Sequence, residues 1–103
     1  VSDTAVIYSK NLKILPGAKE AAGEFLFTAG GQRNRKSYAD LVDFEIHDFA
    51  LEEVLFDPQT SGGLLAALAE DGEKALEELK AAGIPAAIVG EIIPPQDKKI
   101  IVR

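Results

Sequence analysis

DPQTSGG, residues 57–63, runs directly into the apolar stretch LLAAL, residues 64–68. Pro58 biases Asp57 towards an extended backbone, and the glycine pair permits positive φ and close approach by another group. A short apolar run bounded by glycines is typical of a buried strand. The stretch therefore predicts a tight loop that opens onto a strand. Such a loop can present several backbone N–H and hydroxyl donors to an anion.

The residues beyond this loop predict a βαβ unit with a right-handed crossover. Its strands are expected at 64–69 and 86–93, and its helix at 71–83, where Leu76 and Leu79 share one face that we expect to be buried in the core. A turn at 94–97 and a last strand at 99–102 complete a C-terminal hairpin. We expect a single domain over residues 1–103 of the α/β (α+β) class. Its mixed β-sheet has helices packed on one face.

The region before the loop is less regular. Short strands are expected at 5–8 and 12–15, and helices at 18–22 and 48–57, the second capped by Asp48. Residues 28–40 contain a glycine pair and mainly small or polar side chains. They are therefore expected to form the most mobile internal loop.

The composition excludes several classes of function. The 103 residues include no cysteine, so disulfides, a thiol nucleophile and thiolate metal sites are ruled out within them. A single histidine, His47, argues against a histidine metal site or a Ser-His-Asp triad. A net charge of −6 argues against nucleic-acid binding. No apolar run approaches the roughly 20 residues that span a bilayer, so we expect no membrane partner. A cytoplasmic location is expected instead.

Three motifs occur in order along the first two thirds of the chain: LPGA at residues 15–18, GGQRN at 30–34 and DPQTSGG at 57–63. Together they resemble the C-terminal domain of selenophosphate synthetase (selenide, water dikinase), in the superfamily of ATP-dependent synthetases related to AIR synthase. The chain also contains no methionine and begins at Val1. We expect it to be the later part of the C-terminal domain of a larger two-domain enzyme.

The resemblance implies an enzyme that converts ATP, selenide and water into selenophosphate, AMP and phosphate. ATP, Mg²⁺, the catalytic residues and the metal ligands would then be sited mainly in an N-terminal domain, which is the expected partner, and the full enzyme would be a homodimer. This chain alone is expected to be inactive. The resemblance assigns only cleft-facing loop positions here: Asp57, Gln59, Thr60, Ser61, Gly62, Gly63, Gly30, Gly31 and Asn34.

Other interpretations of these residues stay open. Asp57 could bind Mg²⁺ or cap its own turn. Arg33 and Arg35 could neutralise phosphate with their planar guanidinium groups or be solvated loop charges. The chain as a whole could instead be a non-catalytic α/β module that binds an anion or a protein partner. It could also belong to a related AIR-synthase-type enzyme.

Overall fold

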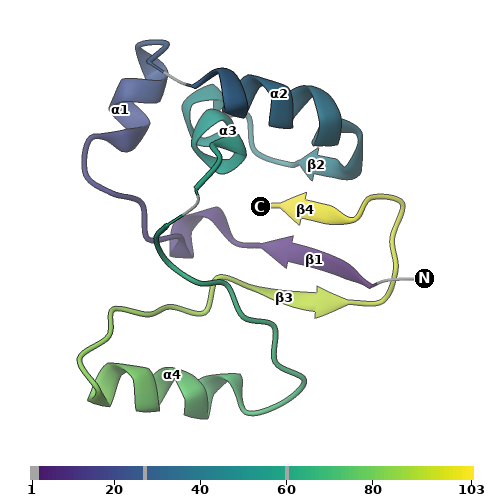
Figure 1. Cartoon of the computed structure of the whole chain (residues 1–103). Helices are drawn as coiled ribbons and strands as arrows, with labels where there is room; N and C mark the ends of the chain where they lie inside the picture. Colours follow the sequence, from purple (N-terminus) through teal and green to yellow (C-terminus); the bar gives the residue numbers. More distant parts are fainter. Residues whose placement is uncertain (1–2, 27, 60) are drawn as a thin grey trace.

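The computed structural model describes residues 3–26, 28–59 and 61–103. Within them four short strands form one mixed sheet in the order β2-β4-β1-β3 (Figure 1). β1 and β2 both run parallel to β4, whereas β3 runs antiparallel to β1. The expected α/β class with a mixed sheet is confirmed. The strands are β1 (Thr4–Ile7), β2 (Val42–Phe44), β3 (Gly90–Ile93) and β4 (Ile100–Val102).

The helices form two groups, one near each edge of this sheet. In Figure 1, α1, α2 and α3 gather on the β2 side, and α4 lies beyond β3 at the opposite edge. α3 packs against both α1 and α2. The described helices are α1 (Ala18–Gly23), α2 (Ala29–Tyr38), α3 (Phe49–Phe56) and α4 (Gly72–Ala81), with 3₁₀ turns η1 (Ser9–Asn11) and η2 (Ala39–Leu41).

The core lies where the central strands meet α3. Val6 of β1 and Val102 of β4 are buried, as are Leu51 and Phe56 of α3. The ring of Phe56 meets that of Phe44 on β2 edge to face, with centroids 5.8 Å apart. This contact ties the sheet to α3, and so fixes where the chain leaves α3.

The C-terminal hairpin is not formed, because β1 lies between β3 and β4. The connection between these strands passes the start of β1 (Figure 1), where the side chain of Thr4 is buried. The Thr4 hydroxyl donates to the carbonyl of Lys98 and accepts from the amide of Gln96, each at 2.8 Å. These bonds, together with the β1 pairings, hold the two expected hairpin partners on either side of β1.

The expected strand at 64–69 is also absent, and with it the expected βαβ unit. Residues 63–68 have no regular secondary structure, and Leu64 is 100% exposed. An apolar run forms a strand only where a neighbouring strand satisfies its backbone groups, and no described strand pairs with this one. Residues 12–15 likewise form no strand.

The helix expected at 71–83 is confirmed as α4. Gly83, with a φ of 79°, ends it in the left-handed conformation that glycine accommodates best. Its apolar face is nevertheless not part of the core, since Leu79 remains 40% exposed. Within the described residues, α4 makes no extended contact with another helix or strand.

The prediction of a mobile loop at 28–40 is wrong, because most of this segment is the ten-residue helix α2. The side chain of Thr28 caps this helix by accepting a bond from the Gly31 amide at 2.9 Å. Arg35 and Lys36 lie in its last turn, where positive charge is favoured by the helix dipole. A cap and a charged C-terminal turn therefore outweigh the low helix propensity of the glycine pair.

Candidate functional site

The two glycine-containing motifs meet in space. A Cβ atom on Gly30 would lie 2.7 Å from Cγ of Pro58, and one on Gly31 would lie 3.7 Å from the Cα of Asp57. Contacts shorter than 3.0 Å require something to move, so Gly30 admits Pro58 only because it has no side chain. The first turn of α2 therefore packs directly against the start of the DPQTSGG loop.

Hydrogen bonds hold this α2–α3 junction together. The Thr28 hydroxyl, besides capping α2, donates to Oδ1 of Asp57 at 2.9 Å. Asn34 donates from Nδ2 to the carbonyl of Phe56, the last residue of α3, at 2.8 Å. That carbonyl lacks an intrahelical partner, so Asn34 acts as a C-terminal cap supplied by another helix. In this structure the carboxylate of Asp57 therefore stabilises the turn after α3 by accepting the bond from Thr28.

Beyond Pro58 the loop is exposed to solvent. Gln59, Ser61, Gly62 and Gly63 are all exposed, whereas Thr60 lies outside the described residues. Gly62 has a φ of 148°, which side chains rarely adopt, and among the described residues a Cβ on it would meet only Oε1 of Gln59, at 4.0 Å. The start of the loop is thus fixed against α2, while its glycine end is open to an approaching group.

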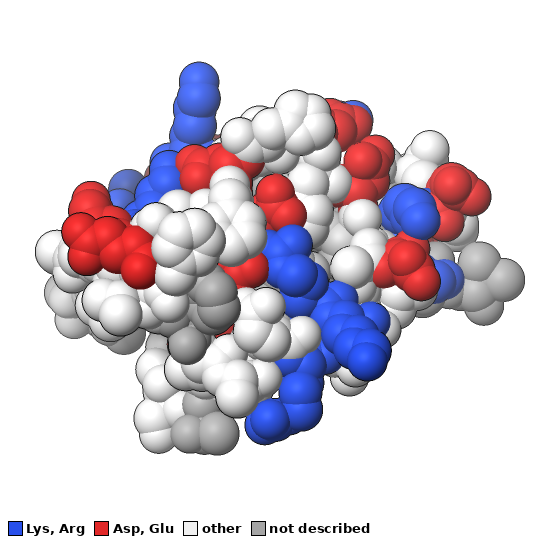
Figure 2. Space-filling model, turned by 90° about the horizontal axis from the view of Figure 1, so that it is seen from above, with Lys and Arg blue, Asp and Glu red and all other residues white. Residues whose placement is uncertain are grey.

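Positive charge lies beside the junction. Arg33 on α2 is exposed, and its Nη2 atom would be 3.7 Å from a Cβ on Gly30. Figure 2 shows Lys and Arg atoms gathered in a band on the face viewed from above. Because Arg33 is exposed and next to the glycine pair, it is the site cation best placed to meet an anion near the loop.

Arg35 is held differently from Arg33. Its guanidinium pairs with Glu52 at 3.0 Å and with Glu53 at 2.7 Å, and it lies over the rings of Phe49 and Phe56. The hypothesis that Arg35 neutralises a phosphate is therefore not supported, because its charge is already matched by two carboxylates. For Arg33, neutralisation of a phosphate stays a prediction.

The site residues thus fall into two groups. Gly30, Gly31, Asn34 and Asp57 are brought together in the junction, each in a contact that builds it. Arg33 and the exposed end of the loop lie next to them without such structural ties in the described residues. This second group is the part of the motif that packing does not explain: Arg33, Gln59, Ser61, Gly62 and Gly63.

Known proteins match nearly the whole chain. A protein of Agathobacter rectalis named selenide, water dikinase is 50% identical over 102 residues, which cover 97% of this chain and 30% of that protein. The resemblance to selenide, water dikinases is confirmed. A relative of the same name from Desulfitobacterium hafniense is 40% identical over 101 residues, and one from Haemophilus influenzae is 33% identical over 101.

The chain spans about 30% of the length of these selenide, water dikinases. No protein-family model matches it. In the described ranges no group of three His, Cys, Asp or Glu residues could hold a metal ion. None of the helices described is long and apolar enough to cross a membrane.

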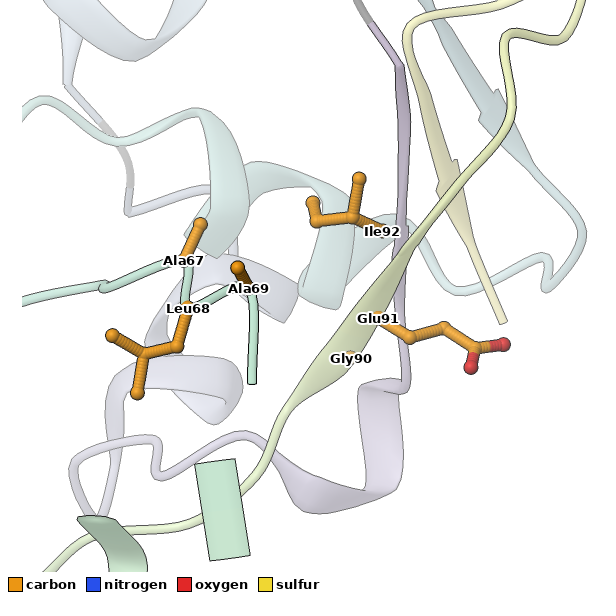
Figure 3. Close-up of a pocket in the computed structure, with 6 residues that line it drawn as sticks. All are labelled: Ala67, Leu68, Ala69, Gly90, Glu91 and Ile92. Carbon is orange, nitrogen blue, oxygen red and sulfur yellow. The ribbon is translucent and has the colours of Figure 1, made fainter. Parts of the chain in front are cut away.

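A separate open hollow of about 540 Å³ lies between residues 67–69 and β3 (Figure 3). Leu68 and Ile92 lie on its two sides, and the side chain of Glu91 points away from the 67–69 segment. Glu91 instead accepts a hydrogen bond from the hydroxyl of Tyr8 at 2.8 Å. This bond raises the pKa of the Tyr8 phenol. The hollow contains none of the site residues.

Sequence reasoning missed Glu53, the carboxylate at the centre of the α2–α3 contact. It is 2% exposed and accepts bonds from Arg35 and Gln32. Its neighbours Glu52 and Val54 are less buried, and nothing in the local pattern separates Glu53 from an ordinary surface glutamate. The only available signal was its helical position, since Glu53 lies three residues before the buried Phe56 and so shares its face.

Proposed function

We propose that this chain is the later part of the C-terminal domain of a selenide, water dikinase. The complete enzyme converts ATP, selenide and water into selenophosphate, AMP and phosphate. In this proposal residues 57–63 and the first turn of α2 face the cleft where the reaction occurs. The 50% identity to a protein of that name over nearly the whole chain supports the assignment of the reaction.

The observation that carries the cleft assignment is the asymmetry of the DPQTSGG loop. Its first residues are packed against Gly30 and Gly31, whereas Gly62 and Gly63 are exposed and a Cβ on Gly63 would meet none of the described residues within 4 Å. A turn that served only to connect elements would need glycine at position 62, because of its φ of 148°, but not at position 63, where φ is not positive. Open glycines next to a fixed base suit the close approach of a ligand or of a second domain.

The chemistry of the exposed group fits phosphoryl transfer. Charge on transferring phosphoryl oxygens is stabilised by positioned cations and hydrogen-bond donors. Arg33 supplies a guanidinium that can bind two phosphate oxygens at once. Ser61 and the amides of Gly62 and Gly63 supply donors. We assign these residues to holding phosphate oxygens, and none of them to the chemical step.

ATP binding, Mg²⁺ and the catalytic groups are assigned to the remainder of the enzyme. The described part of this chain offers no carboxylate cluster for a metal. An N-terminal domain that closes on the 57–63 loop, and a homodimer built mainly through that domain, complete the proposed assembly. The chain alone is expected to make no selenophosphate.

Assays of the full-length enzyme and of residues 1–103 alone test this proposal. With ATP and selenide, ³¹P NMR should detect selenophosphate from the full-length enzyme only, together with AMP and phosphate in equal amounts. Omitting selenide is the control for its ATP hydrolysis. Selenide-independent conversion of ATP into ADP would instead assign the chain to a related AIR-synthase-type enzyme. Selenophosphate made by residues 1–103 alone would contradict the division of roles.

A further inference from the structure

Arg35 is the most heavily contacted polar side chain of the α2–α3 contact. Its Nε donates to Oε1 of Glu53 at 2.8 Å, and its Nη1 donates to Oε1 of Glu52 at 3.0 Å. The guanidinium carbon lies 5.0 Å from the ring centroid of Phe56 and 5.6 Å from that of Phe49. These contacts attach one residue of α2 to most of the length of α3.

Glu53 makes this contact selective for arginine. A carboxylate that is 2% exposed must be matched by a cation or by several donors, because burying an unpaired charge is costly. Arg35 supplies the cation, and Gln32 donates a further bond from Nε2. A lysine in place of Arg35 would supply charge but not the planar group that stacks on two rings.

The contact of Arg35 leads directly to the DPQTSGG loop. Phe56, under its guanidinium, is the last residue of α3, and its carbonyl is bound by Asn34. Asp57 follows and is tied to Thr28, the cap of α2. Any rotation of α3 against α2 would therefore move the base of the loop and the glycine pair relative to each other.

We propose that Arg35, paired with buried Glu53, is a positioning residue for the 57–63 loop. It fixes the rotation of α3 on α2, and so sets where the loop leaves α3 relative to the exposed Arg33. Loop and Arg33 then form one preorganised site for the phosphate oxygens of the nucleotide. The inference rests on the proposed function for what the site binds, but its structural part does not.

The test compares two variants of the Arg35–Glu53 pair in the full-length enzyme. Arg35→Lys keeps the charge and removes the stacking fork. The double variant Arg35→Met with Glu53→Gln removes the pair without leaving a buried charge, so it is expected to fold. Arg103→Met is the matched control, since the side chain of Arg103 forms an exposed pair, with Glu45 at 2.8 Å.

Two readouts are measured on each variant: kcat/KM for ATP per folded molecule, and hydrogen exchange in peptides that cover residues 28–34 and 54–57. We expect both single and double variants at Arg35 to lower kcat/KM at least tenfold, mainly through KM. We expect exchange at the junction to rise at least tenfold while exchange in β1 and β4 is unchanged. Arg103→Met should change neither.

A fall in melting temperature with unchanged kcat/KM and unchanged exchange at the junction would overturn the proposal and leave Arg35 a merely structural residue. If the wild-type enzyme makes no selenophosphate, the proposed function fails while the exchange readout still decides on the positioning role. Normal exchange in the double variant would then reject that role independently.

Discussion

Gly30 is the single residue on which the junction of the two motifs most depends. The absence of a side chain there lets Pro58 lie where a Cβ would be 2.7 Å from its ring. In helices alanine is usually more stable than glycine by about 1 kcal/mol. At this position the steric contact with Pro58 opposes that preference. The ring of Pro58 cannot easily move away, because its loop is held at Asp57, so we expect the change in stability on Gly30→Ala to be unfavourable.

We expect Gly30→Ala to destabilise the protein by about 1–3 kcal/mol, the usual cost of overpacking. Gly72→Ala is the matched control, since Gly72 also lies in the first turn of a helix but a Cβ there would meet none of the described residues within 4 Å. That variant should be neutral or slightly stabilising. Urea denaturation of both proteins measures the difference, and equal stabilities would show that Pro58 yields without cost.

Local patterns predicted single residues well where the cause was local. Asp48 was predicted as a cap and does accept a bond from the Leu51 amide at 3.1 Å. Pro58 was predicted to end the helix before it, and α3 ends at Phe56. Glu53 could not be predicted, because its burial depends on Arg35, which lies 18 residues away in the sequence.

At the scale of elements, α3 is the helix that organises the site. Its N-cap residue, Asp48, is a titratable group. The carboxylate of Asp48 pairs with Lys19 of α1 at 2.5 Å and caps α3. The bonds from Lys19 and from the Leu51 amide lower the pKa of Asp48. A lowered pKa in the folded state means that this carboxylate stabilises the protein above its unfolded pKa of about 3.9.

Asp48→Ala should therefore cost about 0.5–2 kcal/mol at neutral pH, the usual cost of losing a cap. The contribution that depends on charge is complete above about pH 4, and falls away as the pH drops through the lowered pKa of the folded protein. Asp48→Asn keeps a cap and should lose only the charged part. Unfolding curves for the wild type and both variants at neutral and acidic pH check this. A difference in stability between the wild type and Asp48→Asn that persists in acid would contradict it.

The elements that sequence reasoning missed share a physical cause. A Gly-Gly pair and a polar run predict a loop at 28–40, yet the Thr28 cap and the contacts of Asn34 and Arg35 with α3 make most of it a helix. The apolar run at 64–68 predicts a strand, but strands require a partner, and the described chain provides none there. Tertiary contacts, or their absence, determine the secondary structure of both segments, and local sequence patterns do not predict such contacts. The family resemblance predicted that both motifs face the cleft, but not that they pack against each other at one junction.

On the scale of the whole molecule, packing is uneven. The core around β1, β4 and α3 contains most of the described buried residues, whereas the segment from Gly63 to the end of α4 is exposed throughout or nearly so. Its large exposed apolar residues are Leu64, Leu65, Leu68 and Leu79. The expectation that Leu79 is a core residue, drawn from its helical spacing, is wrong for this chain.

This unevenness predicts a difference between two leucine substitutions. Leu51→Ala should destabilise the chain by about 2–5 kcal/mol, because Leu51 is only 4% exposed. Leu79→Ala should cost less than about 1 kcal/mol, as at an exposed site without special contacts. Chemical denaturation of residues 1–103 measures both. Similar losses for the two variants would mean that α4 packs in the core of the protein in solution.

The open end of the DPQTSGG loop is proposed to line the phosphate-binding cleft of a selenide, water dikinase. Melting temperature and selenophosphate turnover, measured on Gly62→Val in the full-length enzyme, test this proposal most directly. Gly83→Val is the control, because Gly83 also has positive φ and open surroundings but lies at the end of α4. Both variants carry backbone strain of about 1–3 kcal/mol. We expect at least a tenfold lower turnover per folded molecule for Gly62→Val, and no such loss for Gly83→Val. Normal turnover in a destabilised Gly62→Val enzyme would contradict it.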